Sequence, residues 1–267
     1  MMSAVERKGT GMGDDLIFET KGLSKEFKGF LAVSDVNLRV RRHTIHALIG
    51  PNGAGKTTCF NLATKFLTPS HGQILFNGRD ITKTAPAAIA RQGMVRSFQI
   101  SAVFGRLSVL ENVRLALLRK IGRSFHFWRS DRSLAVLDDR AVELIDSVGI
   151  AEYRDSPAGE LSYGRKRALE IATTLALEPE MLLLDEPMAG MGSEDIRRTT
   201  DLIRRVAANR TILMVEHNLS VVAELSDTIT VLKQGRLLAE GSYAQVSSNP
   251  EVIEAYMGSG QGGGGHG

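Results

Sequence analysis

Apolar and polar residues recur with two different periods along this chain, and these periods predict strands and helices. Short apolar or alternating runs predict strands over residues 16–20, 32–40, 44–49, 73–76, 181–184, 211–215, 228–232 and 236–239. Apolar stripes at helical spacing predict helices over residues 107–119, 133–148 and 193–208, with two more beginning near residues 56 and 163. Because strands alternate with helices again in the second half, we expect a largely parallel sheet with helices on both faces.

A glycine-rich stretch between a predicted strand and a predicted helix gives the first indication of chemistry. It reads Gly50, Pro51, Asn52, Gly53, Ala54, Gly55, Lys56, Thr57 and Thr58, the G-x-x-x-x-G-K-T pattern of a phosphate-binding loop. Glycines let several backbone N–H groups converge on a polyphosphate, and the following helix adds its positive N-terminal end. We expect Lys56 to bind the β- and γ-phosphates and the Thr57 hydroxyl to ligate Mg²⁺.

Polar residues follow two of the later apolar strands. Asp185 and Glu186 come directly after one strand, and a parallel sheet brings such positions to its ligand-binding edge. There we expect Asp185 to hold Mg²⁺ through water and Glu186 to orient or deprotonate an attacking water. His217 follows the next strand and reaches the same edge. Gln99 is either a sensor of Mg²⁺ or of that water, or a surface glutamine.

Two further candidates have open interpretations. Ser162 and Gly164 stand before a predicted helix, where they form either a second anion site or a simple helix cap. Phe27 lies upstream of the phosphate loop and either stacks on a nucleotide base or packs in the core or a loop. The residues alone do not decide between these alternatives.

Composition limits the class of protein. The chain has 267 residues, of which 43% are hydrophobic and 24% charged, as in ordinary globular proteins. Its net charge of +3 is too small to indicate nucleic-acid binding by itself. The single cysteine, Cys59, fits a reducing compartment, and its place on an apolar helix face predicts a core thiol. Without an apolar run near ~18 residues or a signal-peptide core, we expect a cytoplasmic protein that reaches a membrane through partners.

The motifs together, in this order and spacing, resemble the ATP-binding subunit of an ABC transporter. They are the phosphate loop, Gln99, Leu-Ser-Tyr-Gly at 161–164, Leu-Leu-Asp-Glu-Pro at 183–187, and His217. The resemblance implies an α/β fold: a P-loop NTPase core with a mostly parallel sheet, an antiparallel β portion and an inserted α-helical subdomain. The residues themselves indicate a disordered leader at 1–14, a glycine-rich tail at 260–267 and a helical subdomain at about 90–165, inside a nucleotide-binding domain at 15–259.

The resemblance also implies how the parts work. In this family two ATP molecules lie in a head-to-tail dimer, each between one subunit's phosphate loop and the other's signature segment. By resemblance Phe27 is the adenine-stacking aromatic, Gln99 the Q-loop glutamine, Ser162 and Gly164 the signature, Asp185 the Mg²⁺ aspartate, Glu186 the catalytic base and His217 the switch histidine. The implied partners are two permease subunits, a second ATPase subunit, either self or sister, and indirectly an extracytoplasmic solute-binding protein. The implied location is the cytoplasmic face of the inner membrane.

Within the family the chain is similar to importers of branched-chain amino acids. The similarity rests on Tyr163 in the signature, the phrase at 185–191 and the segment at 249–258. Urea importers and lipopolysaccharide exporters share parts of this pattern. Arg165 replaces the usual signature glutamine, and Gly192 replaces the usual aspartate or asparagine of the D-loop, so both positions depart from the family pattern.

Other classes of ATPase fit less well. A DNA-repair or chromosome ATPase would carry a long coiled-coil insertion, and a translation ATPase would carry two such domains in one chain. A non-catalytic subunit would be expected to lose Lys56 or Glu186, which are both present. The basic and aromatic segment at 119–129 is either a solvated linker or a contact to nucleic acid or lipid headgroups. We expect the linker, and no nucleic-acid partner.

Overall fold

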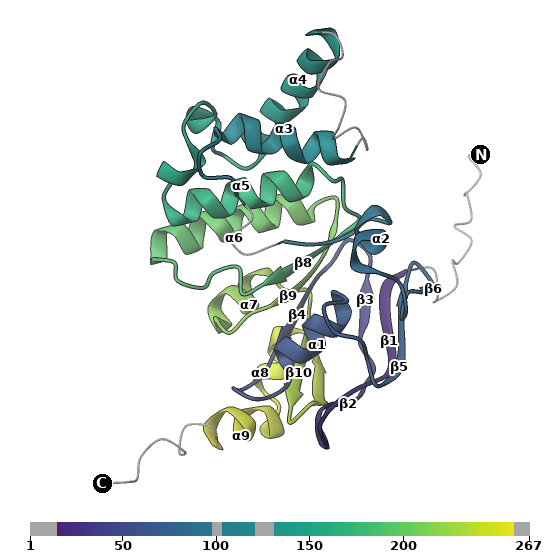
Figure 1. Cartoon of the computed structure of the whole chain (residues 1–267). Coiled ribbons are helices and arrows are strands. Elements are labelled where there is room, and N and C mark those ends of the chain that lie inside the picture. Colours follow the sequence, from purple (N-terminus) through teal and green to yellow (C-terminus); the bar gives the residue numbers. More distant parts are fainter. Residues whose placement is uncertain (1–14, 98–102, 121–130, 259–267) are drawn as a thin grey trace, which may run out of the picture.

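The computed structural model describes residues 15–97, 103–120 and 131–258, and its main sheet has six strands (Figure 1). In spatial order these are β11 (Arg236–Gly241), β10 (Thr228–Lys233), β4 (Ile45–Ile49), β9 (Thr211–Val215), β8 (Met181–Asp185) and β7 (Met94–Arg96). Neighbouring strands are parallel, except that β11 is antiparallel to β10. All five residues of β4 and of β9 are buried. Both faces of this sheet are therefore covered, as expected for parallel strands.

A second sheet is antiparallel and is formed by the N-terminal part of the chain. Its strands are β2 (Phe30–Val36), β1 (Leu16–Phe27), β5 (His71–Phe76) and β6 (Arg79–Asp80), with β3 (Arg39–Arg41) also paired to β1. The prediction of a single strand over 32–40 is wrong, because the strand is interrupted at residues 37 and 38, between β2 and β3. Thr20 fills the break: its hydroxyl donates to the Val36 carbonyl and accepts from the Leu38 N–H, both at 2.8 Å.

Three hairpins turn through two-residue loops with positive φ at both positions. These loops are Lys28–Gly29, Asn77–Gly78 and Gln234–Gly235. Positive φ at both central residues is the type I′ geometry that matches the right-handed twist of paired strands. Each of the three loops has glycine as its second residue, where a positive φ carries little steric cost.

Helices cover the six-stranded sheet from two sides. They are α1 (Lys56–Ala63), α2 (Pro86–Arg91), α3 (Val109–Lys120), α4 (Asp131–Ser147), α5 (Tyr163–Leu175), α6 (Ser193–Ala207), α7 (Leu219–Leu225), α8 (Tyr243–Ser247) and α9 (Pro250–Gly258). Short 3-10 turns, η2 (Ala151–Tyr153) and η3 (Ala158–Glu160), connect α4 to α5. Figure 1 shows α3 and α4 at one end of the molecule, beside α5. These helices confirm those expected over 107–119, 133–148 and 193–208.

Alternate residues of the central strands belong to two different cores. Ile45, Ala47 and Ile49 pack in the core that holds α5 and α6, whereas Leu48 packs in the core that holds α1 and the antiparallel sheet. Because side chains alternate between the faces of a strand, α1 and α5 lie on opposite faces of the six-stranded sheet. The expectation of helices on both faces is confirmed.

Two details differ from what the apolar pattern suggests. Apolar residues continue at helical spacing to Phe66, but the helix after the phosphate loop ends at Ala63 and Phe66 is 55% exposed. Lys65 has a left-handed φ of 64°, which does not continue a helix. The region expected to form the helical subdomain, about 90–165, begins with the strand β7, from Met94 to Arg96, whose Met94 and Val95 are buried where β7 pairs with β8. Within the described ranges, none of the helices has the length and apolar character needed to cross a membrane.

Candidate functional site

The phosphate loop joins the end of β4 to the start of α1. Gly50 and Gly55 have φ values of 151° and 91°, and neither has room for a side chain. A Cβ would lie 2.2 Å from the Leu232 carbonyl oxygen at Gly50, and 2.6 Å from the Ala32 carbonyl oxygen at Gly55. The loop is therefore shaped by close contact with neighbouring backbone. Glycine is needed at both positions.

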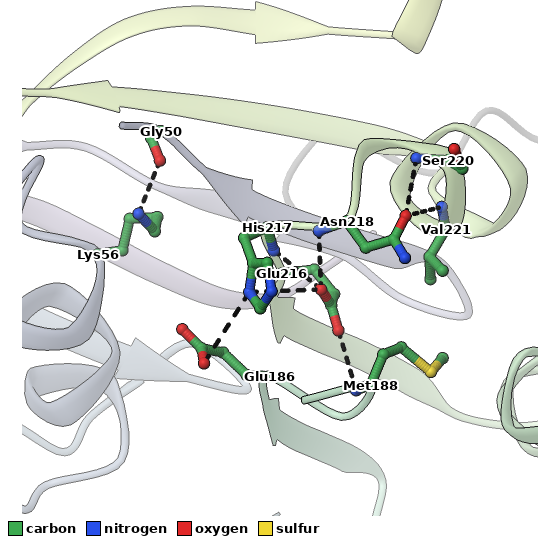
Figure 2. Close-up of polar contacts among 9 residues, drawn as sticks. All are labelled: Gly50, Lys56, Glu186, Met188, Glu216, His217, Asn218, Ser220 and Val221. Carbon is green, nitrogen blue, oxygen red and sulfur yellow. Dashed lines mark hydrogen bonds and ion pairs between the residues drawn. The ribbon is translucent and has the colours of Figure 1, made fainter. Parts of the chain in front are cut away.

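The Lys56 side chain folds back over this loop. Its Nζ donates to the carbonyl oxygen of Gly50 at 2.7 Å (Figure 2) and to that of Pro51 at 3.0 Å. Burial lowers the pKa of Lys56, and the Glu186 carboxylate acts in the opposite direction. No acidic residue occupies the first turn of α1. The positive end of α1 and the Lys56 ammonium thus converge at one place, which suits an anion.

Asp185, at the end of β8, is joined to Arg96, at the end of β7. The Arg96 Nη2 lies 2.5 Å from the Asp185 Oδ2, and both side chains are 17% exposed. Arg96 also donates to the Asn61 side chain of α1 at 2.9 Å. The carboxylate proposed as a magnesium ligand is thus held by a cation from the adjacent strand.

Glu186 and His217 lie next to each other beyond the ends of β8 and β9. The His217 Nδ1 is 4.0 Å from the Glu186 Oε2, and the two side chains are 63% and 43% exposed. Glu186 has a left-handed φ of 43°, an uncommon conformation for a residue with a side chain. Glu186 and His217 therefore meet at one edge of the sheet, as the strand-end argument expected, and Lys56 is near enough for the Glu186 carboxylate to influence its pKa. Solvent reaches Glu186 and His217.

A buried carboxylate that the sequence did not single out lies behind His217. Glu216 is 0% exposed. Its Oε1 accepts from the Met188 N–H at 3.0 Å, and its Oε2 accepts from the N–H groups of His217 at 2.8 Å and Asn218 at 3.0 Å (Figure 2). The only signal in the sequence was an acidic residue between an apolar strand and a histidine. That signal does not reveal backbone donors.

The signature residues begin α5, on the opposite face of the sheet from α1. Ser162 is the N-cap residue, but its side chain makes no capping hydrogen bond. A Cβ at Gly164 would lie 2.6 Å from the Asp195 carboxylate oxygen, so α5 and α6 approach closely here. Ser162 thus has the position of a helix cap without the side-chain hydrogen bond of one, so the anion-site alternative stays a prediction. These residues sit apart from the phosphate loop of the same chain.

Four other features singled out in the sequence have the following outcomes. Phe27, at the end of β1, is 42% exposed, with the Lys25 Nζ 5.1 Å from its ring centre, so it is not a core residue. Gln99 lies outside the residues that the structure describes, and so does segment 119–129 beyond its first two residues. Arg165 stacks its guanidinium 4.1 Å from the Tyr153 ring centre.

The segment that leads to Gln99 is tied to α5 by a buried network that the sequence did not indicate. The Ser97 hydroxyl donates to the Glu170 Oε1 at 2.8 Å, and the Arg167 Nη1 donates to the Glu170 Oε2 at 2.6 Å. Arg167 is 5% exposed and Glu170 is 1% exposed. Burial raises the pKa of Glu170, against the opposing effect of Arg167. The network links the end of β7 to the helix that carries the signature.

The edge of the sheet offers few protein oxygens, which suits Mg²⁺ shared with phosphates and water better than a metal ion bound by protein side chains alone. In residues 15–97, 103–120 and 131–258, no cluster of three or more His, Cys, Asp or Glu side chains is placed to hold a metal ion. Mg²⁺ typically keeps waters and binds one or two protein oxygens together with substrate phosphates. The Asp185 carboxylate, at the end of β8, is a donor of this kind, and Thr57, in the first turn of α1, carries a hydroxyl, so the residues present are compatible with such a site.

A glycine-shaped loop between a buried parallel strand and a helix is how P-loop nucleotide-binding proteins hold phosphates, and the fold and site place this chain in that class. Residues 33–189 match the ABC transporter family, and residues 236–261 match the family described as branched-chain amino acid ATP-binding cassette transporter. The chain belongs to the ABC transporter family, as its motifs indicated.

The chain is similar in sequence and structure to particular members of this family. It is 38% identical to the high-affinity branched-chain amino acid transport ATP-binding protein BraF of Pseudomonas aeruginosa, over 91% of this chain and 98% of BraF. It is also 38% identical to LivG of Escherichia coli K12, a protein with the same description, again over 91% and 98%. A crystal structure of the ADP conformation of an ATP-binding cassette of an ABC transporter is 29% identical, with a TM-score of 0.79. The match covers 91% of this chain and 99% of the cassette.

Proposed function

We propose that this chain is the ATP-hydrolysing subunit of a transporter that imports branched-chain amino acids or related small solutes. The main support is the convergence of Lys56, Glu186 and His217 at the carboxyl edge of the parallel sheet. The similarity to BraF and LivG over nearly their whole length supports the substrate class. The match at 236–261 supports it independently of the phosphate-loop region.

Each residue has a distinct task in the proposed reaction. The phosphate loop and Lys56 bind the β- and γ-phosphates of ATP, and Phe27 stacks on the adenine. Glu186 accepts a proton from water as the water attacks the γ-phosphorus, and the bond from that phosphorus to the bridging oxygen breaks so that ADP leaves with the electron pair. His217, 4.0 Å from Glu186, is placed to hold that water or the γ-phosphate beside the base. Mg²⁺, held by Thr57, Asp185 and Gln99, would neutralise phosphate charge.

The proposed site is completed by a second subunit. Ser162 and Gly164 begin a helix on the opposite face of the sheet from α1, and the Ser162 hydroxyl is not used as a cap. A head-to-tail pair of subunits would bring this segment to the γ-phosphate of the partner's ATP. ATP would then stabilise the closed pair by binding to both subunits, and hydrolysis would release them.

Transport requires membrane partners in this proposal. Two permease subunits would hold the ATPase pair at the membrane on the side where ATP is available. A solute-binding protein on the other side would deliver the solute. The chain itself carries no solute selectivity in this arrangement, so amino acids and amides such as urea are distinguished by the partners.

Reconstitution tests the proposal. The chain is purified with the membrane proteins that accompany it, inserted into vesicles, and supplied with ATP and a candidate solute on its binding protein. We expect ATP-dependent uptake of leucine, isoleucine or valine, and faster hydrolysis when the binding protein carries solute. If no amino acid or amide is taken up while a lipid leaves the membrane on ATP addition, the exporter alternative is correct.

A further inference from the structure

We propose that Glu216 is a positioning residue that sets the geometry between the base Glu186 and His217. The inference deepens the proposed function and rests on it, since it concerns the same hydrolysis. The Glu216 side chain is completely buried, so it does not face solvent at the edge where ATP would bind, although its Oε2 lies 4.0 Å from the His217 Nδ1. Its proposed role is to fix the position of the loop after β8 relative to the loop after β9.

The contacts of Glu216 join two segments that are distant in sequence. One carboxylate oxygen accepts from the Met188 N–H, two residues after Glu186. The other oxygen accepts from the N–H groups of His217 and Asn218. Figure 2 shows His217 between the Glu216 and Glu186 side chains. A single carboxylate therefore fastens the loop after β8 to the loop after β9.

The loop after β8 has a particular need for such a contact. Glu186 adopts a left-handed φ of 43°, which costs free energy and persists only where the surroundings hold it. Its own N–H donates to the Val215 carbonyl at 2.9 Å, and the Met188 N–H is held by Glu216. These two bonds fix the turn on both sides of the left-handed bend. The bend in turn directs the Glu186 side chain toward His217.

The loop after β9 is fixed on both sides of His217. On one side, Glu216 precedes His217, and its side chain accepts hydrogen bonds from the backbone N–H groups of His217 and Asn218. On the other side, the Asn218 side chain caps α7 by accepting from the N–H groups of Ser220 at 3.1 Å and Val221 at 3.3 Å. His217 is thus an exposed side chain on a backbone held by two anchors. Only the Glu216 anchor also touches the loop that carries Glu186.

Glu216→Gln separates this role from a merely structural one. The glutamine oxygen can still accept from His217 and Asn218, but its NH₂ group then faces the Met188 N–H, so the bond between the loops is lost. We expect the variant to bind ATP with an affinity within about twofold of wild type, because the phosphate loop is untouched. We expect its kcat to fall about tenfold to a hundredfold, since displacement of reacting groups by ~1 Å has effects of that order.

A matched control is Thr20→Val. Thr20 is also buried and also bridges two backbone segments, but it lies in the antiparallel sheet away from the site. We expect it to lower the thermal midpoint and to leave kcat unchanged. Glu216→Asp, which keeps a carboxylate on a shorter stem, should have a kcat between wild type and Glu216→Gln. It also serves as the second variant if the glutamine chain does not fold.

A double-mutant cycle with His217→Ala adds a readout that loss of stability alone would not change. If Glu216 acts through the loop geometry, Glu216→Gln should reduce kcat much less in the His217→Ala background than in wild type. Unchanged kcat in both Glu216 variants, or full additivity with His217→Ala, would overturn the inference while wild-type hydrolysis upholds the proposed function. Absence of hydrolysis by the wild-type chain would instead overturn both.

Discussion

Arg96 and Asp185 form an ion pair with 2.5 Å between the Nη2 and Oδ2 atoms, at the ends of two adjacent parallel strands. The Arg96 guanidinium also lies 5.1 Å from the ring centre of Phe60 and 4.6 Å from that of Phe66. The pair is largely shielded from solvent, so its attraction is screened less than that of a surface pair. Arg96 therefore fixes the position of the carboxylate that we propose for magnesium.

Removing one partner of this ion pair should destabilise the fold. Arg96→Met leaves the Asp185 carboxylate without its cation, and we expect a loss of about 2 kcal/mol, between the effects typical of exposed and of fully buried pairs. In the Asp185→Asn background the same change should cost much less. Urea unfolding of the four chains measures the coupling. Arg204→Met, which removes an exposed pair with Asp201 and Glu224, is the control and should change stability far less. Equal losses for Arg96→Met in the two backgrounds would show that the pair contributes nothing.

The burial of His46 leads us to expect that the free energy of unfolding depends on pH. Its ring is 1% exposed, its Nε2 lies 2.8 Å from the Thr230 hydroxyl, and burial lowers its pKa from 6.5 to about 4. The unfolded chain therefore binds a proton between pH 6.5 and 4 that the folded chain does not, so the free energy of unfolding falls as the pH decreases through this window. At 1.36 kcal/mol per pKa unit the loss approaches about 3 kcal/mol.

Urea unfolding between pH 7 and 4 measures this loss. His46→Gln keeps a group that can bond Thr230 but does not titrate, so its stability should fall less over that range. His71→Gln, at an exposed position, is the control and should follow wild type. The same acid loss in His46→Gln as in wild type would assign the dependence to other groups.

The sequence could predict the parallel sheet and the phosphate loop because local patterns determine them. Runs of apolar residues such as 211–215 must be buried on both faces, and the glycines of the loop are dictated by close backbone contacts. The strand β7 was missed because three residues are too few to show a period. The apolar pattern does not mark the end of α1, because Phe66 continues the helical spacing of apolar residues although it is exposed.

The connections within the site could not be predicted in the same way. Arg96 and Asp185 are 89 positions apart, and nothing in the local pattern around Arg96 indicates its partner. Glu216 is bound by backbone N–H groups, including that of Met188, which is 28 positions away. Every residue except proline has a backbone N–H, so residue types do not show which N–H groups bind a carboxylate. Motif spacing therefore predicted which side chains lie at the edge of the sheet, whereas the contacts that hold them are seen only in the three-dimensional structure.

The composite site predicts that lesions in two different subunits can be confined to one of the two sites. A mixed dimer of Ser162→Ala with Lys56→Ala has one site that carries both lesions and one site that is intact. We expect about half of the wild-type hydrolysis from this dimer, and far less from either variant alone. Purification on two different affinity tags isolates the mixed species for the assay. Complete loss of activity would mean that the sites act only together or that the dimer is not head-to-tail.

The central claim, that Glu186 is the base of an ATP-hydrolysing site, is tested most directly by Glu186→Gln. The amide keeps the shape of the side chain but loses the basic oxygen, and general-base catalysis contributes about a hundredfold or more. The measurement is single-turnover hydrolysis of ATP, with nucleotide titration and size-exclusion chromatography on the same sample. We predict normal ATP affinity, hydrolysis reduced at least about a hundredfold, and accumulation of an ATP-bound dimer. Hydrolysis at the wild-type rate by this variant would contradict the account.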